Sequence, residues 1–404
     1  MKTLSPETWR FIQEHREDDV RNLALQGKKY PLVDMAEAVI QIAARQIAEK
    51  KLPSWGSVEG IYYPGHLSME QCSSEQTALY KASLVRGDSF ADLTAGFGVD
   101  CAYISRNFTQ ADYVERQEGL CELATHNFPL LGLNHIRVNH ADGIDFLTKM
   151  EPVDCLFLDP ARRDKNGGKT VAITDCEPDV CALEPLLVEK GKTVLIKLSP
   201  MLDIASALRD LKYIREIHVI SLQNECKELL LILRKEAASV KKETSEVQIH
   251  CVQLFSHAPS QHFSFSYEQE KRAICPISEQ VETYLYEPGA ALLKASPFRL
   301  LASAYGVKKL HSNSHLYTSS QLVDFPGRCF KVVGISGFGK KELKTFLEGV
   351  EKANLTVRNF PSSVADLRKK LKIKEGGEIY LFATTLGDGQ KVLVKCRKVG
   401  QEEA

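Results

Sequence analysis

The segment Asp92-Leu93-Thr94-Ala95-Gly96-Phe97-Gly98-Val99-Asp100 decides the interpretation of this chain. It begins within a short apolar stretch, Phe90–Leu93, and leads into a helical pattern, so we expect a strand, a tight turn and a helix. Glycines at positions 96 and 98 allow such a turn and let the backbone approach a ligand closely. The third glycine of a dinucleotide-binding fingerprint is absent, because position 101 is Cys101. This absence argues against pyrophosphate binding.

An acidic residue follows this loop at a characteristic distance. Glu115 lies at the end of the next predicted strand, 23 positions after Asp92. A carboxylate about 20 residues beyond such a loop accepts hydrogen bonds from the hydroxyl groups of a ribose. The loop and Glu115 together predict a site for a nucleoside-containing cofactor, and a purely structural turn is the alternative.

From Ser89 to about Leu233, short apolar strands alternate with helical stretches, which indicates a parallel sheet with crossover helices. About seven residues separate the last two predicted strands, too few for a crossover helix, so we expect these strands to pair antiparallel. The fold class is therefore α/β, with a seven-stranded Rossmann-like sheet whose last strand is antiparallel. The seven predicted strands are Phe90–Leu93, Tyr113–Glu115, Ile136–Asn139, Cys155–Leu158, Thr193–Leu198, Glu216–Ser221 and Leu229–Leu233.

The rest of the chain divides into further parts. Residues 1–65 predict a helical N-terminal region, in which Ser5 caps a helix that begins at Pro6. We assign residues 66–236 to the sheet domain, 246–328 to an α/β connecting domain and 329–400 to a smaller α/β domain. The polar stretch Ala237–Ser245 is interpreted as a linker.

Most elements of the C-terminal half are also expected from the pattern. A hairpin turn is predicted at Gly387-Asp388-Gly389. The expected helices are Ala290–Ser303, Lys340–Lys352 and Ser362–Lys370. The expected strands are Val247–Leu254, Phe263–Phe265, Cys329–Ile335, Leu355–Arg358, Glu378–Thr384 and Lys391–Val394.

The composition excludes several classes of protein. The chain has 404 residues, 44% of them hydrophobic, and 52 Lys and Arg balance 52 Asp and Glu. A disordered chain and a uniformly basic nucleic-acid binder are therefore excluded. The N-terminus lacks the apolar core of a secretory signal, and no apolar run reaches the roughly 20 residues of a membrane span. Eleven cysteines without CxxC spacing indicate no metal site and no disulfide framework, and favour the reducing cytoplasm.

A second polar segment, Phe157-Leu158-Asp159-Pro160-Ala161-Arg162-Arg163-Asp164, ends the fourth predicted strand. Ligands of open α/β sheets bind at the carboxyl ends of strands. We predict that Asp159 is catalytic, accepts a hydrogen bond from an exocyclic amine and orients its lone pair for methyl transfer, with Pro160 rigidifying the corner. Arg162 and Arg163 are candidates for binding phosphate or a carboxylate. A solvated loop is the alternative for both arginines.

Two more residues follow strands at the same edge. Asp142, after the third strand, either accepts from an adenine amino group or caps the following helix. Lys197, at the end of the fifth strand, either helps to bind substrate or closes a salt bridge. The next residue is Leu198, where covalent attack on a pyrimidine ring would need a cysteine, so that chemistry lacks its nucleophile.

From about residue 70 to 235, these motifs resemble class I S-adenosylmethionine-dependent methyltransferases. Asp92–Asp100 looks like the cofactor loop of bacterial guanine-N2 rRNA methyltransferases. Asp159-Pro160-Ala161-Arg162 looks like the motif of uracil-C5 RNA methyltransferases, whose catalytic cysteine is absent here. The resemblance implies S-adenosyl-L-methionine as cofactor. It places Asp92, Gly96 and Gly98 at the methionine and ribose portion, Glu115 at the ribose, Asp142 at the adenine, and Ser73 and Ser74 near the cofactor carboxylate.

The whole chain resembles a bacterial methyltransferase family with a C-terminal THUMP-like domain, on the segments Asn359–Val364 and Tyr380–Thr385. THUMP modules are associated with RNA, which implies an RNA partner by analogy. Residues 331–404 contain 15 Lys and Arg against 9 Asp and Glu, a net charge of +6. Their densest cluster, Arg368-Lys369-Lys370, is a candidate for binding phosphates, and a solvated basic helix is the alternative.

The expected function is S-adenosylmethionine-dependent methylation of a nucleobase nitrogen in structured RNA, either rRNA or tRNA. Two alternatives remain open. In the first, the enzyme methylates a small molecule or a protein instead of RNA. In the second, the chain is a non-catalytic RNA-binding protein with a vestigial cofactor pocket.

Overall fold

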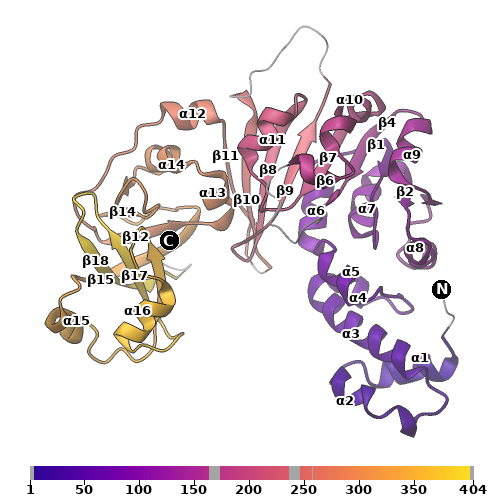
Figure 1. Ribbon diagram of the computed structural model, residues 1–404, viewed down its shortest axis with the longest axis horizontal. Helices are drawn as coiled ribbons and strands as arrows, with labels where there is room; N and C mark the ends of the chain where they lie inside the picture. The colour runs from indigo at the N-terminus through magenta and orange to yellow at the C-terminus, as the bar shows by residue number, and fades with distance from the viewer. Residues whose placement is uncertain (1–3, 163–172, 236–245, 257, 401–404) are drawn as a thin grey trace. The chain divides into compact units, whose positions relative to one another are not determined.

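The computed structural model describes residues 4–162, 173–235, 246–256 and 258–400 (Figure 1). They form two compact units. Unit 1 contains residues 4–217 and 228–235, and unit 2 contains residues 218–227 and 246–400. The predicted linker Ala237–Ser245 lies outside the described residues.

The larger sheet confirms the predicted α/β fold class, but it has nine strands rather than the predicted seven. Its hydrogen-bonded order is β3-β2-β1-β4-β7-β9-β8-β10-β11, in which β10 (Gln248–Leu254) and β11 (Gln261–Phe265) extend the predicted seven. Strands β3, β2, β1, β4 and β7 are parallel, and β9 runs antiparallel to β7. The other strands are β1 (Gly87–Asp92), β2 (Phe108–Glu115), β3 (Ile136–His140), β4 (Val153–Leu158), β7 (Gly191–Leu198), β8 (Ile214–Leu222) and β9 (Glu225–Leu233).

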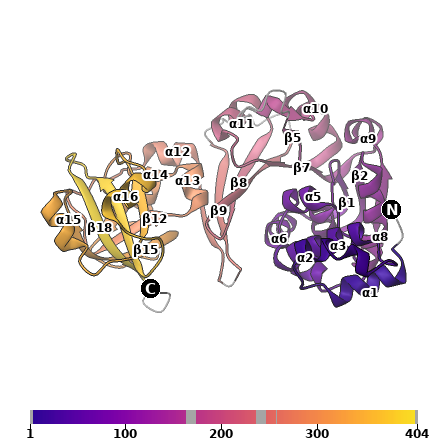
Figure 2. The ribbon, with the colours of Figure 1, turned by 60° about the horizontal axis from the view of Figure 1, so that its bottom comes forward.

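Helices connect the strands of this sheet (Figure 2). The central strands are apolar because helices cover both faces of a parallel sheet; Leu156, Leu195 and Leu231 are all buried. The connecting helices are α7 (Val99–Ile104), α8 (Glu118–Leu130), α9 (Gly143–Lys149), α10 (Val180–Lys190) and α11 (Ile204–Asp210). Two short strands, β5 (Ala161–Arg162) and β6 (Cys176–Glu177), pair antiparallel beyond β4.

The turn between β8 and β9 is tighter than predicted. Only Gln223 and Asn224 separate the two strands, not about seven residues, because both strands continue into polar sequence. Both turn residues have positive φ angles, 51° and 63°. This conformation is the one that two-residue hairpins require, so the predicted antiparallel pairing holds.

The N-terminal region is helical, as predicted. Ser5 accepts a hydrogen bond from the Thr8 amide, which confirms the predicted cap. The region contacts the sheet domain of unit 1: Asn127 of α8 bonds both the amide and the carbonyl of Tyr62. Its helices are α1 (Pro6–Glu14), α2 (Val20–Ala24), α3 (Met35–Lys51) and α4 (Pro53–Gly56). Beyond residue 65, α5 (His66–Gln71) and α6 (Glu75–Ser83) follow.

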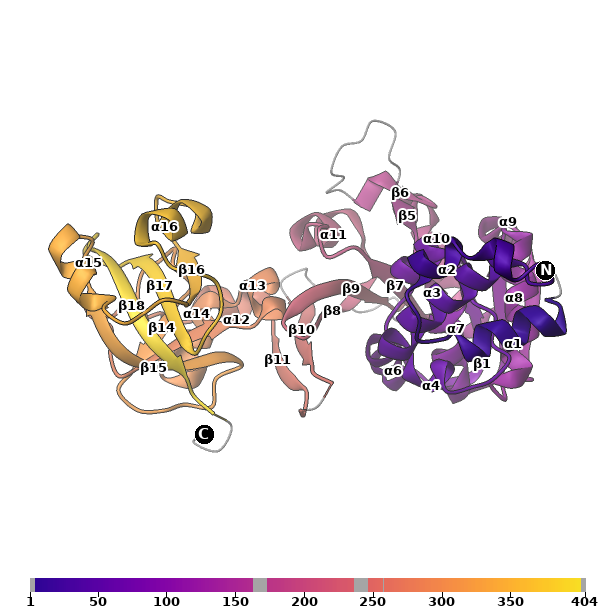
Figure 3. The ribbon, with the colours of Figure 1, turned by 90° about the horizontal axis from the view of Figure 1, so that it is seen from below.

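Unit 2 contains a second sheet of order β13-β14-β12-β15-β18-β17-β16. Its strands are β12 (Tyr284–Pro288), β13 (Lys308–Lys309), β14 (Tyr317–Ser319), β15 (Gly327–Ser336), β16 (Asn354–Arg358), β17 (Ile379–Thr385) and β18 (Lys391–Lys398). One face packs against helices α15 (Lys340–Phe346) and α16 (Val364–Leu371) through residues such as Leu343, Leu367 and Leu393 (Figure 3). Strands β10 (Gln248–Leu254) and β11 (Gln261–Phe265) pair antiparallel and belong to the larger sheet, not to this one. Helix α12 (Tyr267–Arg272) follows β11.

The second sheet combines strands from residues that the sequence assigned to two domains, 246–328 and 329–400. Strand β12 from the first stretch pairs antiparallel with β15 from the second. The predicted domain boundaries remain a prediction.

Two predicted helices of unit 2 differ from the structure. The predicted Ala290–Ser303 is two helices, α13 (Ala290–Ala295) and α14 (Phe298–Tyr305). The break occurs because Ser296 has a φ of 64° and Pro297 cannot donate a backbone hydrogen bond. Helix α15 ends at Phe346 rather than Lys352, before Gly349 takes a φ of 75°. The hairpin at Gly387-Asp388-Gly389 is confirmed by the antiparallel pairing of β17 and β18.

We predict that Asn127→Ala destabilises the protein by about 2–4 kcal/mol, because it leaves the buried amide and carbonyl of Tyr62 without partners. Urea denaturation measures the change. Asn22→Ala on the exposed surface of α2 is the control and changes the unfolding free energy by about 0.5 kcal/mol or less. Equal midpoints for Asn127→Ala and wild type would contradict this account.

Candidate active site

A cavity of about 160 Å³ lies at the carboxyl ends of β1, β4 and β7. The glycine loop, the turn before α6 and the first residue after β4 line it. Six residues predicted from the sequence meet there: Ser73, Asp92, Gly96, Gly98, Asp159 and Lys197. The position agrees with the general rule that open α/β sheets bind ligands at this edge.

The glycine loop has the backbone that the sequence predicted. Gly96 and Gly98 have φ angles of 57° and 86°, which side chains rarely allow. A Cβ atom on Gly98 would lie 2.9 Å from the ring of Phe128, whereas one on Gly96 would have no neighbour nearer than 3.9 Å. The Tyr113 hydroxyl donates to the Gly96 carbonyl at 2.5 Å. Phe128 and Tyr113 therefore fix the loop by packing and hydrogen bonding on one side, and the space next to Gly96 stays open.

Asp92 is buried at the base of this loop, with 1% of its surface exposed. Its Oδ1 accepts from the Thr94 amide at 3.1 Å, and its Oδ2 has no hydrogen-bond partner among the described residues. Burial raises the pKa of Asp92 well above its ordinary value, with further contributions from the nearby carboxylates of Asp100 and Asp159. A buried carboxyl oxygen without a partner is costly. A ligand donor at this edge would relieve that cost.

Glu115 ends β2 and faces the same loop. Its two carboxylate oxygens accept from the backbone amides of Gly96 and Gln117, both at 2.9 Å. These bonds fix the carboxylate beside the loop and leave lone pairs on each oxygen for further donors.

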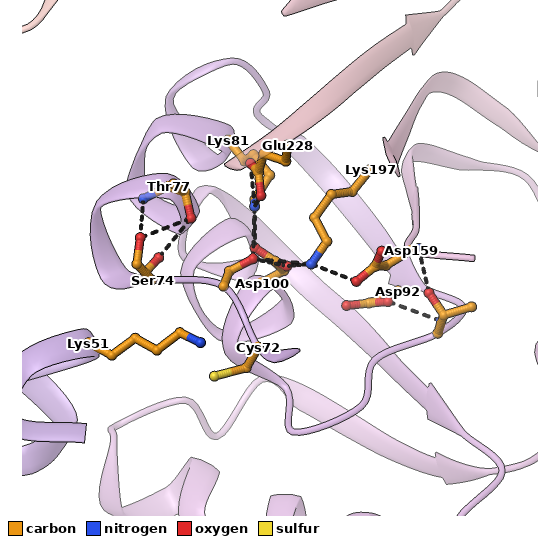
Figure 4. Close-up of polar contacts among 12 residues, drawn as sticks. Lys51, Cys72, Ser74, Thr77, Lys81, Asp92, Asp100, Asp159, Lys197 and Glu228 are labelled. Carbon is orange, nitrogen blue, oxygen red and sulfur yellow. Dashed lines mark hydrogen bonds and ion pairs between the residues drawn. The ribbon is translucent and has the colours of Figure 1, made fainter. Parts of the chain in front are cut away.

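A buried network of charged side chains lies beside the cavity (Figure 4). The Lys197 ammonium contacts Asp159 Oδ2 at 2.6 Å and Asp100 Oδ2 at 3.3 Å. It also donates to Ser73 Oγ at 3.2 Å. The salt bridge considered for Lys197 is thus present, and one of its partners is the predicted catalytic Asp159, whose side chain is 39% exposed.

The network continues away from the cavity to a second lysine. Lys81 of α6 is fully buried and pairs with Glu228 of β9 at 2.7 Å and with Asp100 at 3.0 Å. Ser73 Oγ donates to Asp100 Oδ2 at 2.7 Å and accepts from Lys81 at 2.9 Å. Asp100 therefore joins the two lysines.

The pKa values follow from this arrangement. Burial alone would raise the pKa of Asp100, but Lys81, Lys197 and the hydrogen bond from Ser73 lower it to about 2. Burial would lower the pKa of Lys197, but the carboxylates of Asp159, Asp100 and Glu228 raise it well above its ordinary value. Burial raises the pKa of Glu228, and Lys81 opposes that shift. Lys197 is therefore a permanent cation at neutral pH.

Three predicted cofactor residues do not line the cavity: Glu115, which bonds the glycine loop from β2, Ser74 and Asp142. Ser74 caps α6 by accepting from the Thr77 amide and does not line the cavity. Asp142 caps α9 through its Oδ1, as the alternative interpretation had it. Its side chain lines a different cavity of about 550 Å³ beneath α9, together with residues such as Phe146 and Met150.

The predicted arginines and lysines are distributed between the two units. Arg162 pairs through its backbone with Cys176, and Arg163 lies outside the described residues. Pro160 is buried directly after Asp159. In unit 2, Lys369 and Lys370 are exposed on α16. Arg368 of the same helix bonds the Ala353 carbonyl and pairs with Glu375, so it is partly structural.

Sequence reasoning gave no role to Lys81, Asp100 or Thr94. Thr94 Oγ1 accepts from the Asp159 amide at 2.6 Å and so links the two loops. The partner of Lys81, Glu228, is 147 positions away in sequence, so the sequence around Lys81 does not reveal the pair. The only local signal was a charged residue on an otherwise apolar helix face.

The sheet order and the cavity at its edge define a class I methyltransferase fold. Comparisons agree with this class. The crystal structure of a "putative methyltransferase" from Porphyromonas gingivalis has a TM-score of 0.87 and 34% sequence identity, and the match covers 99% of this chain and 100% of that one. The chain belongs to the family that this structure represents, which confirms the predicted enzyme class, a methyltransferase.

Other comparisons match parts of the chain. A THUMP domain-like family model matches residues 327–398, and a ferredoxin-like domain model matches residues 284–326. Two partial structural matches are a "putative methyltransferase" from Streptococcus mutans in complex with SAH and TrmN from Thermus thermophilus. Their identities are 11% and 18%, and both matches have a TM-score of 0.31. They cover 40% of this chain and 97% and 48% of theirs. The curated proteins searched contain no match.

We predict that Asp100→Asn lowers the free energy of unfolding by about 3–5 kcal/mol at pH 7, because Lys81 and Lys197 lose a buried counter-charge. The folded pKa of Asp100 is about 2, below its ordinary 3.8. Its stabilising contribution is therefore complete above about pH 4 and is lost as the pH falls toward 2. Urea denaturation at several pH values measures both effects.

The control is Asp88→Asn at an exposed position of β1. A gap between Asp100→Asn and wild type that stays constant from pH 7 to pH 2 would contradict the assigned role of the carboxylate.

Proposed function

We propose that the chain transfers the methyl group of S-adenosyl-L-methionine to structured RNA, either rRNA or tRNA. The single observation that carries the proposal is the juxtaposition of the glycine loop, Asp92 and Asp159 around one cavity. The cofactor supplies an electrophilic methyl group on a sulfonium. The family relationship and the THUMP domain-like module support this function.

The residues at the cavity fit such a cofactor. The Asp92 oxygen without a partner suits the donors of the amino acid portion, and the Glu115 carboxylate suits the ribose hydroxyl groups. Gly96 leaves the room that a bound cofactor needs, since no atom outside its chain neighbours lies within 3.9 Å of a Cβ placed there. Ser73 lines the cavity, but its hydroxyl proton is donated to Asp100, so its contact with the carboxylate end of the cofactor stays a prediction from the resemblance. Asp142 would reach the adenine only from outside this cavity.

Asp159 is the proposed catalytic residue. Its amide is fixed by Thr94 and its Oδ2 by Lys197, so its other carboxylate oxygen has a defined direction at the cavity. A carboxylate so placed holds an acceptor group in line with the methyl carbon, and positioning of this kind supplies much of the rate of a displacement reaction. Two kinds of RNA atom suit it, a nucleobase nitrogen, as the sequence predicts, and a hydroxyl oxygen.

The basic surface of α16 is the proposed RNA contact. Lys369, Lys370 and Lys372 are exposed on or directly after this helix, and Lys370 lies 5.7 Å from the ring of Phe338. Exposed lysines attract phosphates without regard to sequence. No helix within the described ranges has the length and apolarity needed to cross a membrane. The eleven cysteines form no disulfide bond among the described residues, which supports the proposed location in the cytoplasm.

We predict that Asp159→Asn lowers kcat for RNA methylation by about 10²–10⁴-fold. The variant also lowers the melting temperature, because Lys197 loses a counter-charge at 2.6 Å, so kcat is compared at a temperature at which both proteins are folded. Methyl transfer from labelled S-adenosylmethionine to RNA from a strain that lacks the protein measures the rate. Asp88→Asn on β1 is the matched control. An unchanged kcat in Asp159→Asn would contradict the proposed catalytic role of this residue.

We predict that replacing Lys369, Lys370 and Lys372 together by glutamine weakens RNA binding and reduces the slope of log K against log salt by up to about 2–3. Fluorescence anisotropy at several salt concentrations measures both. Lys340 and Lys341 on α15, replaced by glutamine, give a control for general positive charge in the same unit.

If the α16 variant methylates normally and wild-type activity is insensitive to salt, a small-molecule or protein acceptor is favoured instead. RNA binding without cofactor binding would favour the non-catalytic alternative.

A further inference from the structure

The cavity presents a carboxylate and an ammonium together beside Asp159, where the proposed function puts the methyl acceptor. Asp159 Oδ2 and Lys197 Nζ are 2.6 Å apart, and both residues line the cavity (Figure 4). Asp159 is the more exposed of the two, whereas the Lys197 side chain is 11% exposed. An acceptor held by the carboxylate therefore lies within reach of the ammonium.

The permanent charge of Lys197 distinguishes between the two kinds of acceptor. When a neutral amine attacks a sulfonium, positive charge moves from sulfur to the amine nitrogen. An ammonium beside that nitrogen opposes the transfer, because like charges repel more strongly in a poorly hydrated site. Three carboxylates, Asp159, Asp100 and Glu228, raise the pKa of Lys197 despite its burial and keep it in this charged form.

A hydroxyl acceptor has the opposite requirement. Its oxygen must give up a proton while it attacks, so negative charge develops on that oxygen. A carboxylate can take the proton, and an adjacent cation stabilises the charge. Asp159 and Lys197 supply these two groups in one ion pair.

The lining of the cavity gives a second, independent argument. Among the described residues that line it, the aromatic ones are Phe97 and Phe157. Phe157 is buried in the sheet, and Phe97 packs edge-on against Trp55, so both rings belong to the core. Enzymes that act on an extruded base stack it between accessible aromatic or apolar side chains. The described lining offers no exposed ring for that purpose.

We infer that the acceptor is a hydroxyl oxygen rather than a nucleobase nitrogen, and specifically the 2′-hydroxyl of a ribose in RNA. The RNA part of this inference rests on the proposed function. The hydroxyl oxygen forms a bond to the methyl carbon as the bond between that carbon and sulfur breaks. The electron pair of the broken bond stays on sulfur, which becomes the neutral thioether of S-adenosylhomocysteine. The hydroxyl proton moves to the Asp159 carboxylate.

The other residues of the network, Asp100, Ser73, Lys81 and Glu228, act as positioning residues in this reaction. Asp100 and Ser73 hold the Lys197 ammonium from the side opposite Asp159. Lys81 and Glu228 neutralise and fix Asp100 from further inside the fold. Lys197 therefore keeps both its charge and its direction when the carboxylate of Asp159 takes up the proton.

Alkaline digestion of the methylated RNA tests the inference. RNA from a strain that lacks the protein is incubated with the full-length wild-type chain and S-adenosylmethionine labelled in the methyl group. Alkali cleaves RNA through the 2′-hydroxyl, so a 2′-O-methyl group leaves an alkali-resistant dinucleotide that carries the label. Label in such dinucleotides is the expected result.

Two other results overturn the inference and are distinguishable from each other. Label in mononucleotides that carry a methylated base rejects the hydroxyl acceptor but supports RNA methylation. No label in RNA, from folded protein that binds the cofactor, rejects the proposed RNA function and the inference with it.

A pair of variants tests the role of the ammonium. Lys197→Met is expected to lower kcat at least 100-fold, and Lys197→Arg, which keeps the charge, is expected to recover part of that loss. Lys192→Met is the control, because Lys192 lies on the same strand β7 but is exposed and pairs with Asp154. Equal kcat values for Lys197→Met and Lys197→Arg, with both variants folded, would overturn the role of the charge.

Discussion

The ion pairs around Asp100 are the interaction on which the active-site edge depends. Lys81 comes from α6, Asp100 from α7, Lys197 from β7 and Glu228 from β9, and the network ends at Asp159 after β4. Each charge is costly to bury alone, and together they are stable only in one arrangement. The network therefore fixes the relative positions of five elements. It also places one carboxylate at the cavity with its cation already attached.

The cofactor loop is held from the other side by packing. Phe97 contacts Trp55 at a ring distance of 5.0 Å, and Trp55 belongs to the helical N-terminal region. Tyr113 and Phe128 fill the space beneath Gly96 and Gly98. The N-terminal helices thus form part of the wall that positions the loop. This contact gives the predicted helical region a physical role within unit 1.

Much of unit 1 could be predicted because its signals are local. The glycine loop, the Asp-Pro corner after β4 and the alternation of strands and helices each occupy a few neighbouring residues. Six of the predicted site residues do meet at one cavity. Lys81 and Glu228 could not be predicted, because 147 residues separate them and only the folded sheet brings them together. Asp142 is a different case. An aspartate that caps a helix and an aspartate that binds a ligand look the same in sequence, so the sequence alone could not decide between the two roles.

In unit 2, sequence patterns predicted most elements but not how strands combine. The break between α13 and α14 depends on one backbone angle at Ser296, which the apolar pattern of the surrounding residues does not reveal. Strand β12 contains the charged residue Glu287, which is buried because it pairs with Arg328 and Arg358. A charged residue in so short a segment argues against a buried strand, so the sequence did not predict β12. Long-range ion pairs thus account for part of what the sequence missed in both units, and the backbone conformation at Ser296 accounts for the missed helix break.

The most direct test of the central claim is calorimetric titration of the folded wild-type chain with S-adenosylmethionine and S-adenosylhomocysteine, beside Asp92→Ala. The account predicts that both ligands bind the wild type and that the variant, shown to be folded by circular dichroism, loses the binding. Failure of the folded wild type to bind either ligand would contradict the account. The loop, Asp92 and the charged network would then be structural features of a protein with another function.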